Sequence, residues 1–381
     1  MVVIKDPIHG NIDLSEMELR LIDTPHMQRL RRIKQLAMAY LVYPGANHTR
    51  FEHSMGTMAL TGHICTHFGF DKEKREKLRA AALLHDVGHL AFSHESESVT
   101  AHIFGDHEKL GRQLMLRSEI TDILDEKYSG KEVADMLHNR ELGQLIVSDI
   151  GSDRMDYLIR DSRYTGVAYG VIDVERIIQT LSMNRGRVVI QENGLESAES
   201  LLVARFMMFS TVYLHHTVRI ASKMLQRSLE NALAAGKITE EQLLALGDAE
   251  ILSLMLDCKE SSALAKGIHY RQLYKEAYSA ELGKLTPEVR KMAKNGDLES
   301  LISEKAGTQV FVDLPTYFAK RAKVMVQKES GLVPIEELSN LVKALELSEK
   351  QRIRLMVCCK PEKRRHVAAT CEKVIGKLLK K

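Results

Sequence analysis

The sequence predicts a mainly α-helical protein with a smaller α+β lobe in its C-terminal part. Seven prolines and no tryptophan occur in 381 residues, and long stretches repeat apolar residues at the period of a helix. After Ala235-Gly236, helical segments alternate with short β-rich runs. With 44% hydrophobic and 28% charged residues, the chain has the composition of a globular protein that can bury a large core.

The helices of the first half are predicted from apolar periodicity and from capping residues. Residues 15–21 form the first helix. Thr24 and Pro25 begin the second, because threonine is a good N-cap and proline fits the first helical position. Residues 43–47 read as a loop from their turn residues. Further helices are expected at 51–68, 72–85, 93–104, 109–117 and 143–164.

The second half combines helices with short strands. Residues 187–192 read as a strand, and the Asn193-Gly194 pair after it predicts the turn of a small hairpin. One or two long helices follow, from residue 196 to about 235. Because the pattern changes there, we expect two domains, residues 1–235 and 236–381. Three strands are expected in the second domain, at 309–313, 322–327 and 353–358.

Charge and cysteine content narrow the class of protein. A net charge of +3 and a locally basic tail are weak evidence for a nucleic-acid partner, so we disfavour one. The five cysteines are odd in number and lack zinc-ribbon or CxxC spacing, which favours reduced thiols and the cytoplasm. With no run of about 18 apolar residues and no signal-peptide pattern, neither a membrane nor export is expected.

A group of polar residues in apolar helical segments predicts a metal site. His53 follows Arg50 at the start of a helix, and the adjacent His85 and Asp86 end another. Such groups are costly to bury without partners, and a divalent metal would satisfy all of them. The alternatives are a hydrogen-bonded core histidine at position 85 and a helix-dipole contact at Glu52-His53. Four aspartates compete for the fourth ligand position: Asp149, Asp153, Asp156 and Asp161.

These residues resemble a known signature. His53, His85-Asp86 and a distant Asp153 are similar to the H…HD…D pattern of the HD-domain metal-dependent phosphohydrolases. The run from His85 to His94 resembles the deoxynucleoside triphosphate (dNTP) triphosphohydrolases among them. The similarity to the vertebrate SAM-and-HD-domain members covers about residues 1–220, without the SAM domain. It rests on residues 6–10, 22–25, 28–36, 44–46, 50–54, 107–108, 153–161 and 205–216.

The resemblance implies an HD-type helical core and hydrolysis of dNTPs to deoxynucleoside and triphosphate. It assigns the metal to His53, His85, Asp86 and Asp153. It implies His94 as the general acid that protonates the leaving sugar oxygen, with a helix cap as the alternative role. The other catalytic positions that it implies are His89, His107 and Glu97, the last standing where relatives have aspartate.

The same resemblance implies the substrate contacts. Arg50, Arg154 and Arg205 fall on phosphate-contact positions, with surface ion pairs as the alternative. Tyr157 and Tyr213 match tyrosines that crowd the 2′ position of the sugar, with helix core as the alternative. Gln35, Leu36 and Asp161 match residues around the 3′-hydroxyl and the sugar face. The sequence departs from its relatives at three of the neighbouring positions: Arg154 for lysine, Phe209 for histidine and Leu214 for glutamine.

The implied cofactor is a divalent metal (Mn, Fe, Mg, Ni or Zn), and a second Mg²⁺ is left open. Asp23, Gln28 and Arg31 match residues that read an activating GTP, although they also suit a helix start and its exposed face. The implied assembly is a homo-oligomer, either a dimer or a tetramer. Two other functions stay open: another HD enzyme, such as a nucleotidase or phosphodiesterase, and a nucleotide- or nucleic-acid-binding protein with a structural metal.

Overall fold

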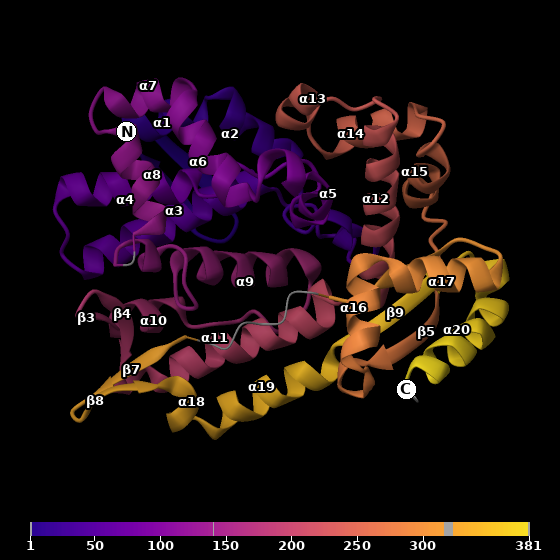
Figure 1. The fold of residues 1–381 in the computed structure, drawn as a ribbon. Helices are drawn as coiled ribbons and strands as arrows, with labels where there is room; N and C mark the ends of the chain where they lie inside the picture. Colours follow the sequence, from indigo (N-terminus) through magenta and orange to yellow (C-terminus); the bar gives the residue numbers. More distant parts are fainter. Residues whose placement is uncertain (1, 140, 316–322, 380–381) are drawn as a thin grey trace. The chain divides into compact units, whose positions relative to one another are not determined.

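The protein, described by a computed structural model over residues 2–139, 141–315 and 323–379, is mainly helical, as predicted (Figure 1). It divides into two compact units. Unit 1 contains Met1–Met208, Ile238–Ser253 and Ala322–Val342, and unit 2 contains Phe209–Lys237, Leu254–Arg321 and Lys343–Lys381. Each of these compact units contains segments from both sides of position 235/236. The expected division into domains 1–235 and 236–381 therefore stays a prediction.

Unit 1 holds most of the helices. Its helices are α1 (Glu16–Ile22), α2 (Pro25–Arg29), α3 (Arg50–His67), α4 (Lys72–Leu84), α5 (His94–Phe104), α6 (His107–Arg117), α7 (Glu119–Asp125), α8 (Gly130–His138), α9 (Ser152–Thr165), α10 (Val174–Thr180), α11 (Leu195–Met208), α13 (Glu240–Ala245) and α18 (Ile335–Leu338). The start of α14 (Asp248–Asp257) also belongs to it. Its strands are β1 (Val2–Asp6), β2 (Gly10–Leu14), β3 (Leu181–Asn184), β4 (Arg187–Gln191), β7 (Met325–Lys328) and β8 (Gly331–Pro334).

Helix α3 is the centre of unit 1. It begins at a capping box, in which the Thr49 side chain accepts from the Glu52 backbone N–H and the Glu52 carboxylate accepts from that of Thr49. Most of its residues are buried, because it packs against α4 and α9. A helix that is buried on nearly every side is rigid, and it therefore holds its polar side chains in well-defined positions.

Two elements of unit 1 correct the sequence-based expectations. The hairpin turn lies at Arg185-Gly186, between β3 and β4, and not at Asn193-Gly194. Both turn residues have positive φ (49° and 73°), the conformation that suits a two-residue hairpin. The helix expected at 143–164 begins only at Ser152, because a short 3-10 helix (Gly143–Leu145) and a loop precede it.

The small sheets were predicted only in part. The N-terminal β1–β2 hairpin was not anticipated. Of the run expected as a strand at 322–327, residues 325–327 lie in β7, residues 323–324 precede it, and residue 322 lies outside the described residues. Strand β7 pairs with β4 in the sheet β3-β4-β7-β8 of unit 1, and so does not belong to the C-terminal lobe where we expected it.

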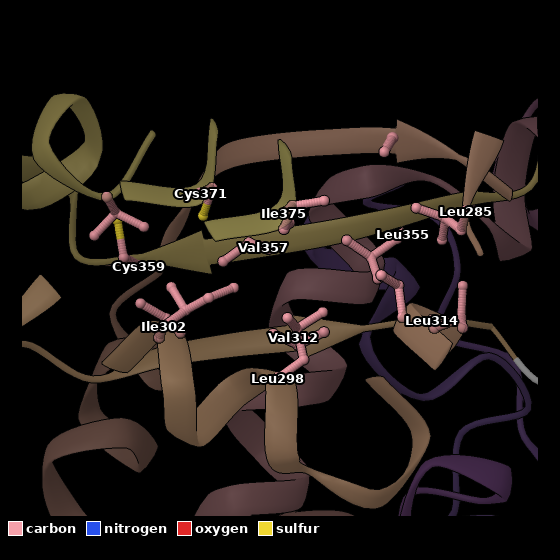
Figure 2. Close-up of a cluster of buried hydrophobic side chains, with 14 of the residues drawn as sticks. Leu285, Leu298, Ile302, Val312, Leu314, Leu355, Val357, Cys359, Cys371 and Ile375 are labelled. Carbon is pink, nitrogen blue, oxygen red and sulfur yellow. The ribbon is translucent and has the colours of Figure 1, made fainter. Parts of the chain in front are cut away.

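Unit 2 is the smaller α+β part. Its helices are α12 (His216–Ala234), α15 (Ser262–His269), α16 (Pro287–Asn295), α17 (Asp297–Ala306), α20 (Arg364–Leu378) and most of α19 (Asn340–Arg352). Its strands β5 (Lys275–Glu281), β9 (Arg354–Cys359) and β6 (Val310–Asp313) form an antiparallel sheet in that order. A π-helical turn (Phe209–Tyr213) precedes α12. Figure 2 shows the core of this unit, where side chains of α17 and α20 meet those of β6 and β9.

Among the described residues, we find no helix with both the length and the apolar character that crossing a bilayer would require.

Candidate metal and catalytic site

Three helices of unit 1 bring a set of metal-binding groups together. His53 lies on α3, His85 is the C-cap of α4, and Asp153 lies in the first turn of α9. One donor atom from each lies within 4.8 Å of the others. Asp153 Oδ1 is 3.0 Å from His53 Nε2 and 3.7 Å from His85 Nε2. Asp86 also faces this group, with Oδ1 3.4 Å from His85 Nε2 and Oδ2 3.8 Å from His53 Nε2.

The hydrogen bonds of the two imidazoles indicate which nitrogen of each can bind a cation. His53 Nδ1 lies 2.7 Å from Asp156 Oδ2, and His85 Nδ1 lies 2.7 Å from the carbonyl oxygen of Ala82. Because both partners are acceptors, each Nδ1 carries a proton, and Nε2, which faces Asp153, is the nitrogen available to a cation. Nε2 of His85 is buried and has no hydrogen-bond partner among the described residues.

The surrounding charges fit a bound cation. Burial lowers the pKa of His53, but hydrogen bonds to Asp153 and Asp156 outweigh it and raise that pKa to about 10. Burial would raise the pKa of Asp153 and of Asp86, yet the facing histidines, and Arg50 beside Asp86, hold both well below their usual range. With this raised pKa, His53 holds a proton on Nε2 that a bound cation would displace, and the two Nε2 atoms with the carboxylates of Asp153 and Asp86 would then supply the donor set of a borderline or hard divalent metal.

The four competing aspartates have different partners. Asp153 faces Nε2 of both histidines. Asp156 supports His53 from behind, Asp161 accepts from His48 Nε2 at 2.8 Å, and Asp149 accepts from the guanidinium of Arg154. The geometry therefore supports Asp153 as the ligand that the resemblance implied.

The residues behind His53 form a buried network that sequence reasoning missed in part. Asp156 also accepts from His9 Nε2 at 2.6 Å and from two nitrogens of Arg160 at 2.9 Å. Arg160 bonds to Asp6 as well, at 2.9 and 3.2 Å. His9 and Asp6 belong to the β1–β2 hairpin. This hairpin therefore helps to fix Asp156, which in turn orients the candidate metal ligand His53. Their only signal in the sequence was their place in the similar segment 6–10.

A second group of titratable side chains lies beside the first. His89, His94, Glu97 and His107 each have a donor atom within 4.8 Å of the others. The rings of His89 and His107 stack with centroids 4.0 Å apart, and the ring of His94 meets both edge-on. Glu97 Oε2 accepts from His107 Nδ1 at 2.6 Å and is 4.0 Å from His94 Nδ1. Glu97 therefore orients His107 more directly than His94.

The backbone after α4 explains how His89 reaches this group. Helix α4 ends at Leu84, so residues 85–93 run as turns and His89 does not lie on a continued helix. At Gly88 an added Cβ would be 2.2 Å from the carbonyl oxygen of His107, which is why only glycine lets the turns approach α6 so closely. That approach brings the rings of His89 and His107 together.

His94 begins α5, and its environment bears on its protonation. Its side chain is 52% exposed. The protein atoms around the ring, then the charges of Arg50 and His107, lower the pKa of His94 below its ordinary 6.5. The alternative of a plain Ser93-His94 cap gains no support, since the Ser93 side chain makes no capping hydrogen bond.

One cavity of about 230 Å³ joins both groups. Of the predicted site residues it is lined by Gln35, Arg50, His53, His85, Asp86, His89, His94, His107, Asp153 and Tyr157. Glu108, Arg112 and His138 also line it, and the predictions did not assign them a role. Five other predicted catalytic or substrate-contact residues of unit 1 are not among its lining: Leu36, Glu97, Arg154, Asp161 and Arg205.

The three predicted phosphate-binding arginines differ in their surroundings. Arg50 is buried and donates to Ser93 Oγ at 2.7 Å and to Asp86 Oδ2 at 2.5 Å. Arg154 donates to Asp149, and Arg205 NH1 is 3.9 Å from the same carboxylate. Asp149 is therefore a shared partner of two candidate phosphate ligands, and the predictions had not given it that role.

The remaining predicted residues lie elsewhere. Tyr213 belongs to unit 2, on the π-helical turn, with its ring edge-on to Phe209 at 5.1 Å. Asp23 caps the C-terminal end of α1. Gln28 donates to the carbonyl oxygen of Ile22 at 2.9 Å and accepts from Arg31 Nε at 3.0 Å.

Comparison with family models agrees with this geometry. The model of the HD domain matches residues 50–161, which contain the four candidate ligands, and the model of the HD associated region matches residues 172–379. The chain belongs to the HD-domain phosphohydrolase family. The HD match ends just after Asp156 and Arg160, whereas His9 lies outside both matched regions.

Relatives and a solved structure extend the HD similarity over most of the chain. An uncharacterized protein of Methanocaldococcus jannaschii is 36% identical, over 95% of this chain and 80% of its own length. The human deoxynucleoside triphosphate triphosphohydrolase SAMHD1 is 27% identical over 81% of this chain, which spans 59% of the human protein. The crystal structure of a phosphohydrolase from Bacteroides thetaiotaomicron is similar with a TM-score of 0.76 and 28% identity, covering 94% of this chain and all of that one.

Proposed function

We propose that this HD phosphohydrolase hydrolyses deoxynucleoside triphosphates to a deoxynucleoside and triphosphate. The observation that carries the proposal is the single cavity that joins the metal-binding group, the histidine group and the buried Arg50. Similarity to SAMHD1, whose name states this activity, supports the choice of substrate. The site needs both a cation for phosphate oxygens and a proton donor for the leaving oxygen, and the cavity offers residues for each.

His53, His85, Asp86 and Asp153 would hold the metal, which is Mn, Fe, Mg, Ni or Zn in this proposal. Such an ion activates water and neutralises phosphate charge when it is bound. Arg50 would contact the equatorial oxygens from its fixed position between Ser93 and Asp86. A second Mg²⁺ would find donors in the group that contains His89 and Glu97.

His94 would deliver the proton to the leaving sugar oxygen. Its pKa lies below 6.5 in the free protein, so the ring is mostly neutral at pH 7. The negative charge of a bound triphosphate opposes the charge of Arg50 and raises the pKa of His94 towards the range in which a general acid works. The partly exposed ring is accessible to a substrate that enters the cavity.

The other parts of the proposal concern specificity and assembly. Tyr157 and Gln35 line the cavity, where Tyr157 would crowd a 2′-hydroxyl. Gln35, Leu36 and Asp161 would lie around the sugar. Activation by GTP at Asp23, Gln28 and Arg31 requires the hydrogen bond between Gln28 and Arg31 to give way to the guanine base. We propose a homo-oligomeric, cytoplasmic enzyme, with a dimer and a tetramer as the two assemblies to distinguish.

Product analysis tests the proposal directly. The purified protein is incubated with each dNTP and with Mn²⁺ or Mg²⁺, with and without GTP, and the products are separated by ion-exchange chromatography. Intact triphosphate with an equimolar deoxynucleoside is the expected result. Release of single phosphates from the same substrates, or turnover of nucleotide monophosphates alone, would contradict it. Light scattering on the same samples gives the mass with and without GTP.

A further inference from the structure

The segment between the metal ligands and His94 has an unusual backbone. Residues 85–93 leave α4 and enter α5, and the last two of them, Phe92 and Ser93, have φ values of +65° and +56°. Residues with side chains rarely adopt this left-handed conformation, and they persist in it only where surrounding groups hold them. The direction of this short segment determines where His94 begins α5.

One carboxylate from a distant part of the chain holds the segment. Asp248, the first residue of α14, accepts from the backbone N–H of Phe92 at 2.7 Å through Oδ1. Its Oδ2 accepts from the backbone N–H of Lys34 at 2.9 Å. Asp248 is buried, so both hydrogen bonds are shielded from water. The residue next to Lys34 is Gln35, which lines the candidate cavity.

The same segment continues to the candidate phosphate ligand. The Ser93 hydroxyl donates to the carbonyl oxygen of Lys34 at 2.9 Å and accepts from Arg50 Nε at 2.7 Å. Arg50 then reaches Asp86. A path of hydrogen bonds therefore connects Asp248 to the candidate metal ligand Asp86. It passes through the backbone of Lys34 and the side chains of Ser93 and Arg50.

The other side of the segment is held by a cation. Arg29 is 2% exposed and donates through NH2 to the carbonyl oxygens of His89 at 2.7 Å and Val87 at 3.2 Å. Two carbonyl groups of the segment thus accept hydrogen bonds from the guanidinium of Arg29, and the backbone N–H of Phe92 donates one to the carboxylate of Asp248. Such a pair of partners fixes a backbone that regular secondary structure does not fix.

We propose that Asp248 is a positioning residue, which sets His94 and Arg50 relative to the metal ligands by fixing Phe92 and Lys34. The inference rests on the proposed function for its effect on catalysis, but not for its effect on the backbone. Asparagine at position 248 keeps the shape and has one acceptor oxygen in place of two, so its NH₂ group would face one of the two N–H donors. That change should loosen one of the two segments.

Hydrogen–deuterium exchange tests the backbone effect without any substrate. In metal-loaded protein, Asp248→Asn should raise the exchange rate of peptides covering residues 33–36 or 88–96 at least several-fold, with metal content unchanged. The matched control is Glu250→Gln, on the same helix, whose carboxylate contacts Arg32 and the backbone N–H of Gly247. Exchange in Asp248→Asn that equals the wild type in both peptides would overturn the inference.

Kinetics distinguish positioning from general destabilisation. Asp248→Asn should lower kcat for dNTP hydrolysis at least 10-fold and change KM less than 3-fold, whereas Glu250→Gln should change neither. In a background of His94→Ala, Asp248→Asn should cost at least 3-fold less than it does in the wild type, because His94 is one of the two groups that Asp248 is proposed to position. Fully multiplicative losses would overturn the inference.

Two further experiments distinguish a failure of the inference about Asp248 from a failure of the proposed function. If Asp248→Asn does not fold, Ser93→Ala removes only the hydroxyl between Lys34 and Arg50, and a wild-type kcat in that variant would overturn the proposed path. A wild-type protein that does not hydrolyse dNTPs would contradict the proposed function, while the exchange experiment would still decide the role of Asp248.

Discussion

Each imidazole of the candidate metal centre is oriented by the nitrogen that faces away from it. His53 donates to Asp156, and His85 donates to a backbone carbonyl, so both present the remaining nitrogen to Asp153. Partners of this kind fix the tautomer and the direction of a ligand. The centre therefore depends on which atom of each residue faces inward as well as on the residues themselves.

The first prediction separates two neighbouring aspartates. Asp153→Asn should remove most of the bound metal and all turnover, because a carboxylate facing Nε2 of both imidazoles is lost. Asp149→Asn should keep the metal and raise KM, because it releases Arg154 and Arg205 from their shared partner. Metal analysis by mass spectrometry and steady-state kinetics measure the two effects. Full metal content in Asp153→Asn would refute our choice of ligand.

The second prediction concerns proton transfer. His94→Ala should lower kcat by about 10²–10⁴-fold, the usual loss when a positioned proton donor is removed. Binding of dNTP and of the metal at His53, His85, Asp86 and Asp153 should change little, since the half-exposed ring is not one of those four proposed ligands. Single-turnover rates and calorimetric binding check the two parts. A near-normal rate would assign the general acid to another residue of the cavity.

At the scale of secondary-structure elements, the N-terminal hairpin does more than cover the surface. Asp6, at the end of β1, and His9, in the turn of the hairpin, join the network around Asp156 and Arg160. Arg160 is fully buried, so this network is shielded from water and its charges must be matched by one another. The position of α9 against α3 is thereby tied to a strand pair at the start of the chain.

The third prediction tests this support. His9→Ala should weaken metal affinity by about 10–100-fold, the usual effect of losing a group that supports a metal-binding histidine. Asp13→Asn, in the exposed part of the same hairpin, is the matched control and should leave affinity unchanged. Competition with a fluorescent chelator measures both. Equal affinities in the two variants would show that the hairpin has no part in metal binding.

How far the sequence predicts these elements depends on the range of the interactions. The capped start of α2, the strand at β6 and the set of candidate ligands follow from local patterns and from resemblance. The hairpin turn was misplaced because positive φ at Arg185 has no side-chain signature. The contacts of His9 with Asp156 and of Asp248 with Phe92 join residues 147 and 156 positions apart, and no spacing rule predicts such pairs.

At the scale of the whole molecule, unit 1 is assembled from three separate segments of the chain. Residues 238–253 return to it after the chain has entered unit 2, and they carry Asp248. Burial raises the pKa of Asp248 to about 6, and the two backbone N–H donors lower it only in part. An acid whose pKa is raised in the folded state binds its proton more tightly there than in the unfolded chain.

The fourth prediction follows from the sign of this shift. The contribution of Asp248 to the free energy of unfolding is greatest below about pH 4 and is lost as the pH rises through about 6, by up to about 3 kcal/mol. Asp248→Asn lacks this dependence, so its stability relative to the wild type should increase from pH 4.5 to pH 7.5. Urea denaturation at several pH values measures the difference. Parallel curves for the two proteins would contradict the raised pKa.

Such a result would mean that the residue proposed to order the catalytic segment does so at the expense of stability at neutral pH. Functional sites commonly contain groups of this kind, because the arrangement that suits a reaction is seldom the most stable one. At neutral pH, Asp248→Asn should then have a lower kcat than the wild type and a free energy of unfolding that is no smaller.

The order in which these groups occur along the chain has a consequence for biosynthesis. His9, the candidate metal ligands and Arg160 all leave the ribosome before Asp248, which follows Asp153 by 95 residues. At about 5–20 residues per second, roughly 5–20 seconds separate the last candidate ligand from the carboxylate that holds Phe92 and Lys34. A nascent chain can therefore capture its ion before the segment leading to His94 is fixed, so that metal loading precedes the completion of a catalytically competent centre.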